Sequence, residues 1–169
     1  MAGPTAGVLV TGLPADLPWC EIMTGIADQW LDPNFCWISD STKFGGTFLG
    51  EPRPFVGGVY RIQQDRYCGL SLEECAAASR ATNKAFTHVV ELGAMSKSAA
   101  DHRLLCEIAR CLAARHDGYV DFCGIVTERP CQGLITVHWL EEDREMATQL
   151  GTPDACEWWL RQDTFHMIK

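Results

Sequence analysis

The clearest periodic pattern lies between Ser98 and Val126, where a helical repeat changes into a strand-like run. Apolar residues recur there at steps of three and four, which places them on one face of a helix. A hydroxyl at Ser98 with a carboxylate at Asp101 is typical of a helix start, and Gly118 stands where a left-handed residue ends a helix. We expect a helix over 98–115 and a strand over 119–126. The helix should bury Leu104, Leu105, Ile108, Cys111 and Leu112.

The rest of the chain alternates shorter strand and helix patterns, separated by glycine and proline. The pattern also predicts that 119–126 pairs with 133–140 as a hairpin, and that Gly57 and Gly58 mark a bulge or a close backbone approach. Residues 40–54, rich in glycine and proline, are predicted to be a loop or a short irregular hairpin. Strands are predicted at 7–12, 35–39, 55–62, 86–92, 133–140 and 164–168, and helices at 17–31, 71–80 and 153–161.

The order of these elements predicts an α+β fold, with a largely antiparallel sheet and helices packed on one face. The strand and helix order of the first half recurs about eighty residues later, although residue identity between the halves is negligible. We therefore treat residues 1–169 as a single domain that contains two possible half-repeats, 7–81 and 86–169, each a βαββα unit.

Composition and charge limit the kinds of partner, location and cofactor that we expect for this chain. The chain has 169 residues and a formal net charge of −8, which opposes binding to the phosphates of nucleic acid. It has no apolar run of about eighteen residues and no basic N-terminal start before an apolar stretch, so we expect no membrane association and a cytoplasmic location. The nine cysteines are scattered, odd in number and without a CxxC pair. We expect them to be reduced, with no metal and no cofactor.

Candidate chemistry is sparse. Asp121 lies inside an apolar strand, and a carboxylate there must either face outward or find a partner. With His138 and Cys123 it makes an alternative polar site, which a small enzyme could use for cysteine or histidine chemistry. The sequence contains neither GxSxG nor HExxH, so no catalytic residue is assigned.

The C-terminal part of the chain carries a resemblance. Residues 101–126, the two adjacent tryptophans at 158 and 159, and the closing segment 164–169 resemble small bacterial proteins encoded beside secreted polymorphic toxins. The pattern G-x-[IV]-D-F-x-G is matched by Gly118, Val120, Asp121, Phe122 and Gly124, with Cys123 where a small residue is expected. The resemblance covers about the last seventy residues. It implies an immunity protein, a non-catalytic cytoplasmic inhibitor that occludes the active site of its cognate toxin.

The residues that would serve such a role are an acidic cluster and two aromatic side chains. A cluster of carboxylates attracts a basic partner, and tryptophan is a frequent anchor at interfaces. The alternatives are a solvated loop for the acidic cluster, and a small enzyme or a generic protein-binding domain for the chain. The predicted toxin-binding residues are Glu141, Glu142, Asp143, Glu145, Trp158 and Trp159, and the predicted partner is a basic toxin domain.

Overall fold

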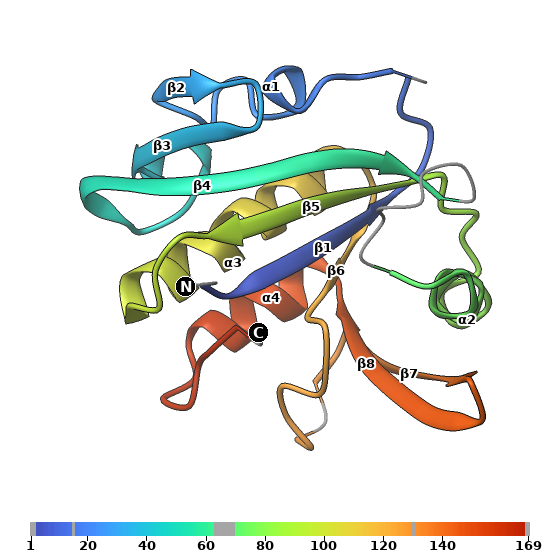
Figure 1. The fold of residues 1–169 in the computed structure, drawn as a ribbon. Coiled ribbons are helices and arrows are strands. Elements are labelled where there is room, and N and C mark those ends of the chain that lie inside the picture. The colour runs from blue at the N-terminus through green and yellow to red at the C-terminus, as the bar shows by residue number, and fades with distance from the viewer. Residues whose placement is uncertain (1–2, 15, 63–69, 130, 168–169) are drawn as a thin grey trace.

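The computed structural model describes residues 3–14, 16–62, 70–129 and 131–167. These residues form one eight-stranded sheet in the order β2-β3-β4-β5-β1-β6-β8-β7, and every neighbouring pair is antiparallel (Figure 1). The α+β prediction is therefore confirmed. The strands are β1 (Thr5–Val10), β2 (Gln29–Asp32), β3 (Phe35–Asp40), β4 (Leu49–Arg61), β5 (His88–Ala94), β6 (Tyr119–Asp121), β7 (Leu134–Glu141) and β8 (Arg144–Gly151).

Four helices accompany the sheet in the described residues: α1 (Trp19–Ile22), α2 (Leu72–Thr82), α3 (Ala99–Arg115) and α4 (Pro153–Leu160). The prediction placed the helices on one face, and α1, α3 and α4 share one apolar core there. Helix α2 differs, because its residues Cys75 and Ala78 pack on the opposite face against Leu9 and Val89. No helix in the described part of the chain is long and apolar enough to cross a membrane.

Helix α3 is the centre of the larger core. All five of its predicted apolar residues are at most 7% exposed, and burying side chains of this kind contributes roughly 1.5–3 kcal/mol each. The predicted start is also confirmed, because Ser98 Oγ accepts from Asp101 N at 3.2 Å and Asp101 Oδ2 accepts from Ser98 N at 3.2 Å. This capping box satisfies two backbone donors that the first turn leaves open.

The end of α3 differs from the prediction. The left-handed residue is Asp117, with φ 48°, whereas Gly118 begins the path into β6. A Cβ on Gly118 would lie 2.4 Å from the carbonyl oxygen of Leu9 on β1. Glycine is therefore required by the close packing of two backbones and not by a left-handed turn.

The predicted helix over 17–31 is wrong beyond Ile22. The chain forms only the short α1, passes through Gly25 at φ 75°, and then makes β2. The apolar residues Trp19, Ile22, Met23 and Ile26 are nevertheless buried, whereas Trp30 is 41% exposed. The Trp30 ring meets the Trp19 ring edge-on at 5.4 Å between centroids. Of the two forms predicted for 40–54, the structure has the irregular hairpin: β4 begins at Leu49, which pairs with Asp40 across a register shift. At the other terminus, 164–167 contains no strand, and residue 168 lies outside the described residues.

The predicted hairpin of 119–126 with 133–140 is wrong. Strand β7 pairs with β8, which the sequence pattern missed, and β8 lies between β7 and β6. Two acidic residues, Glu142 and Asp143, make the two-residue turn between β7 and β8 with φ 47° and 64°. Asn-Gly or Asp-Gly normally occupies such a turn, so this turn carries no clear sequence signal.

The centre of the sheet joins the two predicted half-repeats. Their first strands, β1 and β5, pair from Thr5↔Gly93 to Val10↔His88. The two halves differ in which of their strands lies next to this central pair. In the first half it is the last strand, β4, which borders β5; in the second half it is β6, the first strand after α3, which borders β1. The result is one continuous sheet in which each central strand lies between two strands of the other half: β5 between β4 and β1, and β1 between β5 and β6.

Candidate functional site

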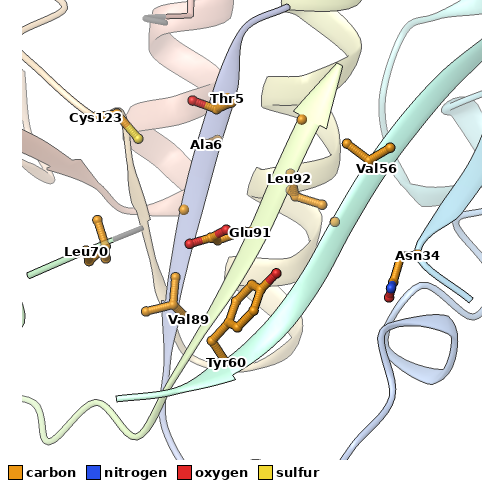
Figure 2. A pocket seen from close by; sticks show the side chains of 13 residues that line it. Thr5, Ala6, Asn34, Val56, Tyr60, Leu70, Val89, Glu91, Leu92 and Cys123 are labelled. Carbon is orange, nitrogen blue, oxygen red and sulfur yellow. The ribbon is translucent and has the colours of Figure 1, made fainter. Parts of the chain in front are cut away.

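A cavity of about 460 Å³ lies on the face of β1, β4 and β5 that α3 does not cover (Figure 2). Gly7 and Gly58 flank Glu91 directly on the two neighbouring strands and keep the sheet surface low around it; of these two glycines, Gly7 also lines the cavity. The Tyr60 side chain folds over Gly58, where a Cβ would lie 2.6 Å from the tyrosine hydroxyl. The strand register therefore places the Glu91 carboxyl group and the Tyr60 phenol close together, above glycine residues of the sheet.

The cavity has an apolar wall and a polar rim. Figure 2 shows the Glu91 and Tyr60 side chains next to each other. Thr5 lies on the neighbouring strand β1, and Cys123 lies in the segment that follows β6. Val56, Val89 and Leu70 contribute the apolar surface. A site of this size with few convergent polar groups is typical of small-ligand pockets.

Behind this cavity lies a pair of carboxyl groups, Asp121 on β6 and Glu74 on α2. Asp121 is fully buried, and its Oδ1 accepts from Thr148 Oγ1 at 2.6 Å and from the Cys123 amide at 2.7 Å. Burial, followed by the Asp121 charge, raises the pKa of Glu74 to about 8, and burial also raises the pKa of Asp121. The Asp121 charge opposes ionisation of Glu74, so at neutral pH the pair together holds one proton, on Glu74.

Cys123 lies at the edge of the cavity in the left-handed region, with φ 57°. The residue as a whole is exposed, but desolvation of its sulfur, together with the nearby Asp121 and Glu74 carboxyl groups, raises the pKa of the thiol to about 12. The thiolate is the nucleophilic form of cysteine. The thiol is therefore held in its unreactive state at neutral pH.

The predicted polar trio is brought together only in part. Asp121 and Cys123 are in contact, whereas His138 lies on β7 among the residues that face away from Asp121. The register explains this: Asp121 faces the same side as Leu150 and Ile135, and alternation along β7 sends His138 to the other side. His138 instead has its Nδ1 3.6 Å from Glu145 Oε1.

The predicted acidic cluster forms the tip of the β7–β8 hairpin. Glu142, Asp143 and Glu145 are exposed and Glu141 is partly exposed. Two apolar side chains flank these carboxylates: Leu140 is 66% exposed and Met146 is 39% exposed. Leu140 pairs with Glu145 and Met146 pairs with Trp139, so the two apolar side chains lie on opposite faces of the hairpin. Each face of the tip therefore presents one exposed apolar side chain close to carboxylates.

The two predicted tryptophans are far from this tip. Helix α4 follows the opposite end of β8, and an eight-residue strand spans roughly 25 Å. Trp159 is 2% exposed, and its Nε1 donates to the His166 carbonyl oxygen at 2.9 Å. Trp158 is partly buried and stacks on Trp159 with 6.1 Å between ring centroids. Trp159 is therefore a core residue, and the six predicted residues do not form one surface patch.

Sequence reasoning missed Glu91, Tyr60 and Glu74 as members of a site. A signal existed for the first two, since the adjacent Gly57 and Gly58 predicted a close backbone approach. The structure confirms that approach, because a Cβ on Gly57 would lie 2.4 Å from the Glu91 carbonyl oxygen. Glu74 follows Ser71 by three residues, a spacing that is typical of a helix start and says nothing of a site; in the structure Ser71 Oγ accepts from Glu74 N at 3.1 Å.

Comparison with known proteins gives a family without an assigned activity. Among curated proteins and among solved structures, no match was found. The family model for DUF6368, described as a family of unknown function, matches residues 2–169. Nearly the whole described fold, including the cavity, the carboxyl pair and the acidic hairpin, lies within the matched region, and the chain therefore belongs to the DUF6368 family.

Proposed function

We propose that this chain is an immunity protein, a cytoplasmic inhibitor that binds a basic toxin domain and occludes its active site. The observation that carries the proposal is the acidic β7–β8 hairpin tip. Within Glu141–Glu145 four carboxylates accompany a single arginine, and the whole chain has a formal net charge of −8. An exposed acidic surface of this kind accelerates association with a basic partner and disfavours acidic ones.

The chemistry of the tip suits docking better than catalysis. Leu140 and Met146 supply exposed apolar contacts, and the neighbouring carboxylates are available to pair with lysine or arginine. The two-residue turn holds these groups on a paired hairpin, which limits the conformational entropy that binding must remove. Trp158 and Trp159 are not part of this proposed surface because they lie at the far end of β8.

The test is co-expression of this chain with the toxin domain encoded beside it, followed by purification of the complex and a growth assay. We expect Glu142→Lys/Glu145→Lys to lower the association rate by about 10- to 100-fold at low salt. The matched control is Glu21→Lys/Glu51→Lys, which changes the net charge equally at exposed residues outside the hairpin. Equal loss in both variants would assign the effect to net charge and contradict docking at the tip. Absence of both a complex and growth rescue with the unaltered chain would refute inhibition.

A second candidate function is small-ligand binding or catalysis in the cavity that contains Glu91 and Tyr60. Its volume and mixed lining favour it. Cysteine chemistry is disfavoured there by the raised pKa of Cys123 and by the position of His138 on the other face of the sheet. A screen of metabolites by thermal shift, with Glu91→Gln as the test variant, distinguishes this function: a ligand that stabilises only the chain with Glu91 intact supports it.

A further inference from the structure

The two edges of the sheet are built differently. At one edge β2 has four residues, its register with β3 is irregular between Trp30 and Asp32, and Pro33 follows directly. Short length, irregularity and proline all protect an edge strand from pairing with another chain. At the other edge β7 has eight residues, contains neither proline nor lysine, and keeps an unbroken register with β8. Only the β7 edge is a regular template for another strand within the described part of the chain.

The hydrogen-bonding groups of that edge can be assigned from the register. At the end of the hairpin nearest to α4, Thr152 N donates to Gly133 O at 2.9 Å. Because hydrogen-bonded and non-hydrogen-bonded pairs alternate along an antiparallel ladder, every second residue of β7 turns its N–H and C=O away from β8. These residues include Thr136, His138 and Leu140, all of which are exposed.

The side chains of a strand added beside β7 would contact protein surface on both faces of the sheet. On one side α2 packs over β7, where Val137 is buried. On the other side Thr136 and His138 line a cavity of about 340 Å³ between the hairpin and the segment around Thr127. Successive side chains of an added strand point to alternate faces, so one set would enter this cavity and the other would approach α2.

The acidic charge at the end of β7 indicates which kind of chain could pair with this edge strand. The β7 edge ends at Glu141, beside Glu142, Asp143 and Glu145 at the hairpin tip. A second copy of this chain carries the same net charge of −8, so like charge opposes its approach to this acidic surface. We propose that the toxin partner adds an extended basic segment to β7 as a ninth strand, with its lysines or arginines beside the acidic tip. This inference rests on the proposed function and specifies how the inhibitor holds its partner.

The test uses proline at positions whose amides point outward. Thr136→Pro and His138→Pro remove a donor from the edge without removing a hydrogen bond to β8. The matched controls, Thr136→Ala and His138→Ala, change the same side chains and keep the amide. With a catalytically inactive form of the adjacent toxin domain as the probe, we expect about 100-fold weaker binding for the proline variants and near-normal binding for the alanine variants.

Hydrogen exchange on the unaltered complex gives an independent readout that requires no variant. Exchange at the amides of Thr136, His138 and Leu140 should slow at least tenfold in the complex, whereas the inward amides of β7 are already protected in the free chain. Unchanged exchange at these amides, or normal binding by a folded proline variant, would overturn strand addition. Inhibition would still stand if Glu142→Lys/Glu145→Lys weakened the same complex. A dimer of the free chain that Thr136→Pro abolishes would assign the edge to a second copy and overturn the proposal.

Discussion

The buried pair of Glu74 and Asp121 makes stability depend on pH in a way that one substitution can reveal. In the folded chain the pKa of Glu74 is raised from its ordinary value of 4.5 to about 8. The folded state therefore binds a proton that the unfolded state releases. Its stabilising effect is complete below pH 4.5 and is lost as pH rises through 8. We predict that Glu74→Gln, which stays neutral at every pH, removes this loss.

The magnitude follows from the shift. A change of 3.5 pKa units corresponds to an upper bound of roughly 5 kcal/mol at 1.36 kcal/mol per unit. Glu74 lies in the first turn of α2, where the helix N-terminus favours a carboxylate and water can approach. We therefore expect Glu74→Gln to be more stable than the unaltered chain by roughly 2–3 kcal/mol at pH 9 and of similar stability at pH 5.

The assay is urea unfolding under reducing conditions at pH 5, 7 and 9, followed by tryptophan fluorescence. Glu73→Gln is the matched control, because Glu73 is an exposed neighbour in the same helical turn. It should leave the pH dependence of the unfolding free energy unchanged. If Glu74→Gln and the unaltered chain show parallel pH profiles, Glu74 does not hold a proton at neutral pH and the reasoning fails.

Two further predictions concern the backbone and the thiol. Gly118→Ala should lower the unfolding free energy by about 2–4 kcal/mol, because the added Cβ would lie 2.4 Å from the Leu9 carbonyl oxygen. The same urea titration measures this loss. A loss below about 0.5 kcal/mol, which is the usual range for harmless surface changes, would contradict the close packing. Cys123 should react with iodoacetamide at pH 8 at least tenfold more slowly than a cysteine in a short peptide, because its pKa is about 12. Peptide mass spectrometry checks this rate, and labelling at the peptide's rate would show that the thiol is not desolvated.

The sequence predicted best what local patterns determine. Helix α3, its buried stripe and its capping box follow from residues within one or two helical turns of one another. The region 17–31 misled the prediction because apolar residues continue at helical spacing past Gly25, although the backbone turns there and Trp30 enters a strand. Strand β8 was missed because its outer half is exposed, its inner half is buried throughout, and the turn before it lacks glycine.

The candidate site was less predictable because its members come from distant segments. Asp121 was identified as a carboxylate that needs a partner, but its partner Glu74 is 47 residues earlier on a helix that no pattern places against β6. The juxtaposition of Glu91, Gly7 and Gly58 depends on the register of three strands. Such contacts are fixed by sheet topology and not by local spacing.

The central position of β1 constrains how the molecule can assemble. During synthesis, residues 5–10 leave the ribosome well before residues 88–94 and 119–121, which are their hydrogen-bonded neighbours. Strand β1 must therefore remain without either neighbour until these later segments have emerged, and closing such long loops slows folding. A cell that makes this protein would need to shield this apolar strand during translation, which is a natural point of contact with chaperones.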